Sequence, residues 1–385
     1  MTRHRSRTFV SHSGGKAVPI PSYLHGYDQS NALATQHCYD ELGPGDPHPL
    51  LITLDDHWYG VISGQPSRYF NVTNWHGIWG PLVVPDMGCP EVADAALMGM
   101  AKTNINSTVV DVPVFLAELR DLPDMLRHLG NRLTRLTSFA KTRKGSYSLK
   151  DLAEDNLVLN FGWSPLFQDL GKMLDFVGDV DKRLNQLDRL YSDRGLRRMQ
   201  TVYNNEIVDS HSMDAYPFAN YGADARVRIW LTTSASMWVS TNWKPASKPT
   251  FKTDQEKLDL ARRLCYGFNG IEASSIWNAM PWTWLTDWFY HVGDFWAAHR
   301  NSVPTECTEV CVMRKTTVKA TRYEWLYKPN RPVTFRLKRT PLYTEKCRWV
   351  SSPLVAPSIH LPFLSGKQLS ILSSLAFTQR FGKIG

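Results

Sequence analysis

The feature that most constrains the fold is the stretch WNAMPWTWLTDWFYHVGDFW, residues 277–296, in which eight of twenty residues are aromatic and five are tryptophan. So much indole suits a membrane anchor, a platform for stacking nucleic-acid bases, or the core of a helical bundle. Asp287, His291 and Asp294 lie inside the stretch. A charged group near the centre of a bilayer costs a few kcal/mol or more, which argues against a membrane anchor.

The stretch also lacks the charge that a stacking platform needs. Exposed rings that stack on bases lie beside Lys or Arg, and no Lys or Arg occurs between residues 277 and 296. On a helix, Trp277, Trp284 and Trp288 fall near one line, and a second apolar line runs beside it. The sequence therefore predicts one largely buried helix. Asp287 and Asp294 would lie roughly 10 Å apart along its axis, which favours structural hydrogen bonding over shared acid–base chemistry.

The charge of the chain favours an anionic partner, and its cysteine content favours synthesis in a reducing compartment. The 385 residues carry a net charge of +8, with a pI of about 9.1, and a basic balance of this kind attracts polyanions. Six cysteines show neither a disulfide framework nor a zinc-site spacing, so reduced thiols and synthesis in the cytoplasm are expected. The N-terminus lacks an apolar signal region, and no apolar run is long enough to span a membrane.

Periodicity divides the chain into alternating blocks of β and α character. Residues 1–90 contain short strand-like runs between turn signals, for which irregular β structure and loops are expected. Residues 199–250 and 301–350 alternate as strands do, whereas 91–198, 251–300 and 351–385 show helical spacing. The blocks are long and contain no regular βαβ alternation. The prediction is an α+β protein with a helical region and a separate β-sheet region, interleaved in sequence.

Three further helices can be predicted from the sequence, two of them from capping signals. "PEVADAALMGMAK" predicts a short helix after Cys89, and Thr253 with Glu256 forms a capping box. Ser164 and Pro165 open a helix that is expected to continue into the charged run of residues 183–198.

A long helix over residues 111–140 carries the strongest basic pattern. Apolar residues recur at alternating spacings of four and three, with a break expected at Pro123. The cations on the opposite arc, and those that extend it into the next loop, are Arg120, Arg127, Arg132, Arg135, Lys141, Arg143 and Lys144. This nearly one-signed arc is either a solvated face or a contact for phosphates, and the seven residues are the candidate RNA-binding set.

No enzyme motif stands out. The chain has no phosphate-binding loop, dinucleotide fingerprint, nucleophile elbow or paired metal-ligand helix. "LDDHWYG" brings Asp55, Asp56 and His57 together, but adjacent residues do not converge on one point, so a solvated turn is expected. No catalytic residue, metal or cofactor is predicted.

Two stretches together resemble a known family. NFGWSPLFQDL, residues 160–170, and the tryptophan-rich stretch are similar to the paired signatures of the maturation proteins of small positive-strand RNA bacteriophages, the leviviruses. The matching residues of the first signature are Phe161, Gly162, Trp163, Pro165, Leu166 and Asp169. Those of the second are Trp277, Pro281, Trp282, Trp284, Asp287, Trp288, Val292 and Gly293. The C-terminal helix ending in "TQRF" also looks similar.

The resemblance implies an elongated virion protein that replaces one coat-protein dimer, in a single copy per particle. The helical region would face the capsid and bind hairpins near the 3′ end of the genomic RNA. The β region would face the receptor, a bacterial pilus, for entry. The motif residues are expected to fix the helical core. A host-directed adhesin or lysis factor that does not bind RNA, and an enzyme without a recognised motif, remain as alternatives.

Overall fold

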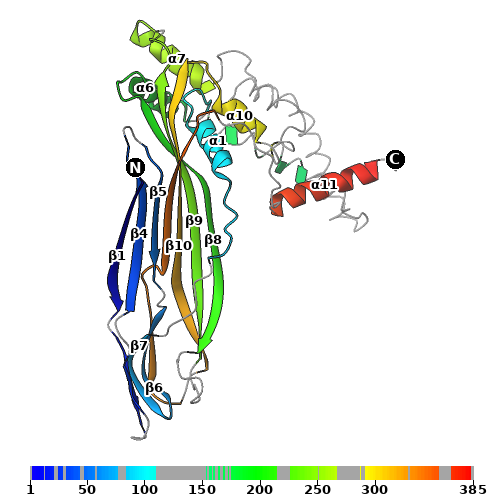
Figure 1. The fold of residues 1–385 in the computed structure, drawn as a ribbon. Helices are drawn as coiled ribbons and strands as arrows, with labels where there is room; N and C mark the ends of the chain where they lie inside the picture. Colours follow the sequence, from blue (N-terminus) through cyan, green and yellow to red (C-terminus); the bar gives the residue numbers. More distant parts are fainter. Residues whose placement is uncertain are drawn as a thin grey trace. The chain divides into compact units, whose positions relative to one another are not determined.

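The computed structural model has an α+β fold (Figure 1). It describes residues 2–12, 14–20, 25–28, 32–43, 47–56, 59–76, 84–109, 175–214, 226–249, 251–266, 291–327, 330–354 and 366–382, together with Asp287 and scattered positions between 153 and 172. Antiparallel strands form two sheets, and helices alternate with them along the chain.

The chain divides into two compact units that are interleaved in sequence. The first unit comprises residues 1–99, 199–241 and 309–354, and the second comprises 100–198, 242–308 and 355–385. Both sheets contribute to the first unit, and α6, α7, α10 and α11 belong to the second.

The larger sheet has seven strands in the order β1-β4-β5-β12-β10-β9-β8. Their bounds are β1 Thr2–His12, β4 Ala32–Glu41, β5 Leu50–Asp55, β12 Tyr343–Ser351, β10 Thr305–Tyr327, β9 Arg226–Pro245 and β8 Leu196–Asp214. The expected β character of residues 1–90 is confirmed, but the strands are more regular than expected, because β1 and β4 pair in register over about their whole length. The regularity of these strands could not be predicted from local turn signals, because part of their pairing is long-range. For example, β5 pairs with the distant β12.

A five-stranded sheet packs against the first through a shared apolar core. Its order is β11-β6-β7-β2-β3, with β11 Val333–Leu337, β6 Gly60–Ser67, β7 Phe70–His76, β2 Lys16–Pro19 and β3 Tyr27–Asp28. Alternate residues point to opposite faces of a strand, so Val318 and Ala320 of β10 enter this core with Ile229 of β9 and Phe70 of β7. On the opposite face of this part of β10, Lys315 and Lys319 are exposed.

The predicted helices after Cys89 and at Thr253 are confirmed. α1 spans Val92–Thr103, and α7 spans Asp254–Tyr266. The Glu256 N–H donates to Thr253 Oγ1 over 3.2 Å, as the predicted capping box requires. α11 spans Gly366–Gly382. No helix within the described ranges is long and apolar enough to cross a membrane.

Two predicted helices are interrupted. α6 spans only Phe176–Leu190, because the chain turns at Asp175 before it. α10 spans only Val292–Ala298, and His291 before it has the left-handed φ of 46°. The tryptophan-rich stretch is therefore not one continuous helix, and Trp296 is 39% exposed rather than buried.

Buried asparagines and arginines organise the second unit around residues 103–108. The Asn104 amide donates to the carbonyls of Ala297, Ala298 and Arg300, which end α10. Arg183, which is 5% exposed, donates to the carbonyls of Ile105 and Ser107. Burial lowers the pKa of this guanidinium, and backbone carbonyls replace the water it loses. This arrangement could not be predicted from local sequence patterns, because the partners are distant along the chain.

The expected solvated turn at Asp55–His57 is wrong for Asp56. Asp56 and Lys338 are each 6% exposed and form an ion pair in the first unit. Asp55 ends β5, and His57 lies outside the described residues. The burial of both charged groups favours a structural role for this pair.

The six cysteines are free thiols in the structure. Cys265, Cys311 and Cys347 are buried, and the other three are partly exposed. Within the described ranges, no group of three His, Cys, Asp or Glu side chains is placed to hold a metal ion.

Candidate functional site

Most of the residues singled out from the sequence lie outside the described ranges. This holds for the whole RNA-binding set of Arg120, Arg127, Arg132, Arg135, Lys141, Arg143 and Lys144. It also holds for the motif residues Phe161, Gly162, Trp163, Pro165, Trp277, Pro281, Trp284 and Trp288. The two motif carboxylates, Asp169 and Asp287, are described.

Asp287 caps the helix that follows it. The Gly293 N–H donates to Asp287 Oδ1 over 2.8 Å, at the first turn of α10. A Cβ atom on residue 293 would lie 2.8 Å from Asp287 Oδ2, so any residue larger than glycine would require the carboxylate to shift from this position. A carboxylate is also favoured by the positive end of the helix dipole. Asp and Gly at this spacing thus have a structural reason to occur together.

The other carboxylates near the motifs also make local contacts. Asp169 accepts from Lys172 Nζ over 2.7 Å on the protein surface. Asp294 Oδ2 lies 3.4 Å from His291 Nδ1. Asp287 and Asp294 therefore have separate partners and do not form an acid–base pair.

The strongest functional feature within the described ranges is the face of the seven-stranded sheet that points away from the core. We call it the basic sheet face and define it by Lys315, Lys319 and Lys346. Lys315 of β10 lies directly opposite Lys346 of β12. Directly opposed residues share a face, with Cβ atoms about 5 Å apart, and like charges there are destabilising.

No carboxylate within the described ranges forms an ion pair with any of these three exposed lysines. The acid next to them in sequence, Glu345, points to the opposite face because side chains alternate along β12. There it binds Arg314 Nη2 over 2.6 Å. Lys315 and Lys346 therefore face each other without a carboxylate partner among the described residues.

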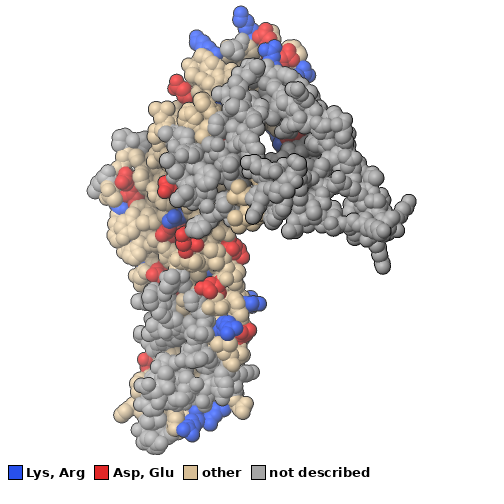
Figure 2. All heavy atoms as spheres, turned by 90° about the vertical axis from the view of Figure 1, so that its right-hand side faces the viewer, with Lys and Arg blue, Asp and Glu red and all other residues tan. Residues whose placement is uncertain are grey.

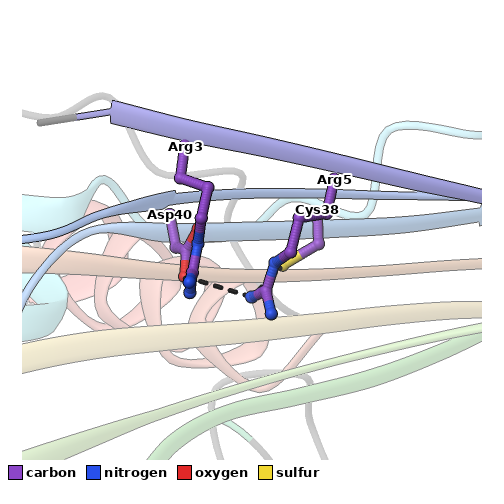
Figure 3. A network of polar contacts seen from close by, with 4 residues as sticks. All are labelled: Arg3, Arg5, Cys38 and Asp40. Carbon is purple, nitrogen blue, oxygen red and sulfur yellow. Dashed lines mark hydrogen bonds and ion pairs between the residues drawn. The ribbon is translucent and has the colours of Figure 1, made fainter.

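At the edge of the same sheet, two arginines are neutralised by a carboxylate (Figure 3). Arg3 and Arg5 of β1 converge on Asp40 of β4, with nitrogen–oxygen distances of 2.5 and 3.1 Å. Hydrogen bonding from Arg3 lowers the pKa of Asp40. Arg5 also donates to Cys38 Sγ over 3.4 Å. Because register joins Arg5, Cys38, Ile52, Lys346 and Lys315 into one row across the sheet, the compensated and uncompensated cations share a face.

A hollow of about 420 Å³ lies over the basic sheet face. It is lined by Gln36, Ile52, Leu54, Asn204, Ser234, Ala235, Ser236, Lys315, Thr317, Lys319, Pro341, Thr344 and Lys346. Three ammonium groups stand among hydroxyl and amide groups, and the lining contains no carboxylate. Such a surface donates hydrogen bonds to an anion and stabilises its charge.

The space-filling view shows that charge is unevenly distributed on one face of the molecule (Figure 2). Lys and Arg side chains gather at the lower end of this view, where Figure 1 places β6 and β7. Further up, basic and acidic side chains alternate. Lys and Arg side chains also occur at the upper end of this view, where acidic side chains lie beside them.

Comparisons with known proteins leave the family of the chain open. No protein-family model matches it. No curated protein matches it either.

Proposed function

We propose that the chain is a virion maturation and attachment protein of a small RNA bacteriophage. In this proposal it binds the genomic RNA at hairpins near the 3′ end, takes the place of one coat-protein dimer and attaches the particle to a bacterial pilus. It is synthesised in the host cytoplasm, ends in the virion as a single copy, and acts without enzymatic activity or a cofactor.

The polyanion-binding part of the proposal is carried by one observation, the Lys315–Lys346 pair. Two exposed lysines directly opposed across a sheet cost stability. An anion that binds between them removes that cost, and each phosphate contact releases a counterion. The net charge of +8 supports the same conclusion for the whole chain.

The family part of the proposal rests on the paired signatures. The contact of Asp287 with the Gly293 N–H supplies a physical reason for two of the motif positions. We infer that the remaining motif residues pack a helical bundle in the second unit, within an elongated molecule. In this proposal the second unit faces RNA and capsid through its helical arginines, and the first unit faces the receptor and also offers the basic sheet face to a polyanion.

RNA binding is tested with the full chain. The affinity for genomic RNA is measured against salt concentration, and we expect the logarithm of the binding constant to fall by about 0.7 to 0.9 per log unit of salt for each phosphate contact. Replacing Arg127, Arg132 and Arg135 with Glu should weaken binding and lower this slope. If both stay unchanged, the helical arginines are not the RNA site.

Attachment is tested by imaging intact particles mixed with host pili. The proposal expects one copy of the chain at the point where a particle meets a pilus. Protein purified from infected cells without RNA, but still bound to the host surface, would favour the adhesin or lysis factor instead.

A further inference from the structure

A second hollow, of about 880 Å³, adjoins the basic sheet face within the first unit. We call it the β10–β11 groove. Its lining residues are Lys319, Ala320, Thr321, Arg322, Tyr323, Thr334, Phe335, Arg336, Leu337 and Arg339. Lys319 also lines the first hollow, so the two hollows meet at this residue.

Four cations line the groove, and its lining contains no acid. Lys319, Arg322, Arg336 and Arg339 are exposed, and within the described ranges none of them forms an ion pair. The alternation of β11 produces this arrangement, because Val333 and Phe335 are buried while Arg336 points outward. The groove therefore combines an apolar floor with a positively charged rim.

Aromatic rings in and beside the groove are held in place. Tyr323 is 38% exposed, and its ring meets that of Phe335 edge-on at 4.8 Å between centroids. Trp325 supports Tyr323 from another side at 6.5 Å. Arg322 lies over the ring of Trp230 at 4.1 Å, which fixes its guanidinium as a flat surface. A ring fixed on one side and exposed on the other can stack on a base.

We propose that the β10–β11 groove binds a single-stranded segment of RNA, with phosphates on the arginines and a base stacked on Tyr323. This deepens the proposed function and rests on it, since it assigns to the first unit an RNA contact separate from the helical arginines. Sites for single strands combine a basic groove with aromatic rings in this way. Bases of a single strand are free to stack on Tyr or on Arg guanidinium planes, whereas in a duplex they are stacked on each other.

An acidic peptide is the competing occupant, and the groove favours RNA over it. Carboxylates would use the four cations, but they offer no flat ring to Tyr323. Three of the four cations are arginines, whose planar fork suits phosphate oxygens and also stacks on bases. If removing the Tyr323 ring weakens binding, the occupant is RNA rather than an acidic peptide.

The test measures binding of a short fluorescent oligouridylate to the full chain by anisotropy over a range of salt concentrations. Arg336→Glu with Arg339→Glu should weaken binding at least tenfold and lower the salt slope by about 1.4, which corresponds to two phosphate contacts on a single strand. Arg336→Gln with Arg339→Gln should lower the slope in the same way if the reversed charges impair folding. Lys244→Glu with Lys248→Glu changes the net charge equally, at exposed residues outside the groove, and should leave the slope unchanged.

Stacking is tested at Tyr323. Tyr323→Ala should weaken binding about tenfold, whereas Tyr323→Phe keeps the ring and should bind as the parent does. Equal affinities of these two variants, or displacement of the RNA by polyglutamate at equal charge concentration, would show a general anion surface and overturn the proposal. Unaltered binding by the arginine variants would also overturn it. A parent chain that binds neither the oligonucleotide nor genomic RNA would instead refute the proposed function.

Discussion

At the scale of single residues, Lys338 and Asp56 form a buried ion pair in the first unit, and each side chain is only 6% exposed. Removing one partner of a buried ion pair leaves an uncompensated charge and costs about 3–5 kcal/mol, whereas replacing both by apolar groups is often nearly neutral. We therefore expect Lys338→Met to lower the urea midpoint strongly, and Lys338→Met with Asp56→Leu to recover most of the loss. Unfolding followed by tryptophan fluorescence measures both. A double variant no more stable than Lys338→Met would contradict a compensated pair.

Two other residues make the first unit sensitive to alkali. Burial raises the pKa of Cys347 from 9.0 to about 11, and burial with a hydrogen bond to Glu345 raises that of Tyr343 from 10.0 to about 12. The unfolded chain releases these protons first as pH rises, so the folded state binds more protons in this window. The stability they contribute is complete below about pH 9 and is lost progressively up to about pH 12.

The measurement is the urea midpoint at about pH 8 and about pH 10.5. The parent should lose stability between the two, and Cys347→Ala with Tyr343→Phe should lose less. An equal loss in parent and variant would assign the alkaline sensitivity to other groups.

At the scale of an element, α10 depends on a cap that lies outside it. Because Asp287 accepts from the Gly293 N–H, Asp287→Ala should cost about 1 kcal/mol. Gly293→Ala should also destabilise the parent, since the new Cβ displaces the carboxylate. In the Asp287→Ala background the same change should stabilise by up to about 1 kcal/mol, because alanine favours a helix over glycine. A double-mutant cycle from urea unfolding measures this reversal of sign, and simple additivity would rule out the shared contact.

Elements were predictable where their signal is local. The start of α7 follows from Thr253 and Glu256, and β10 follows from its own alternation. The interruption at His291 was not predictable from apolar spacing, because the cap comes from a side chain upstream of α10. The basic sheet face was hidden for a similar reason. Lys315 and Lys346 are distant in sequence, and only the register of β10 and β12 makes them neighbours.

For the whole molecule, the question is whether the net charge of +8 acts as a diffuse attraction or through specific surfaces. Diffuse charge is screened beyond a Debye length of about 8 Å at physiological salt. Every exposed lysine would then contribute similarly to RNA binding. The basic sheet face differs from such a diffuse field in one respect, which is that its like charges are opposed in register and therefore strained.

Lys346→Glu distinguishes the two cases because it should change stability and binding in opposite directions. The new carboxylate would face Lys315 and replace a repulsive cross-strand pair with an attractive one, worth about 0.2–1 kcal/mol. The urea midpoint should rise, while the affinity for RNA should fall, together with its salt slope. Lys244→Glu makes the same change in net charge at an exposed site and should leave the midpoint unchanged, with only a small loss of affinity. If both variants lose affinity equally, the chain holds RNA by its overall charge. If Lys346→Glu instead lowers the urea midpoint, the opposed lysines are not in repulsive contact, and the proposed anion site loses its physical basis.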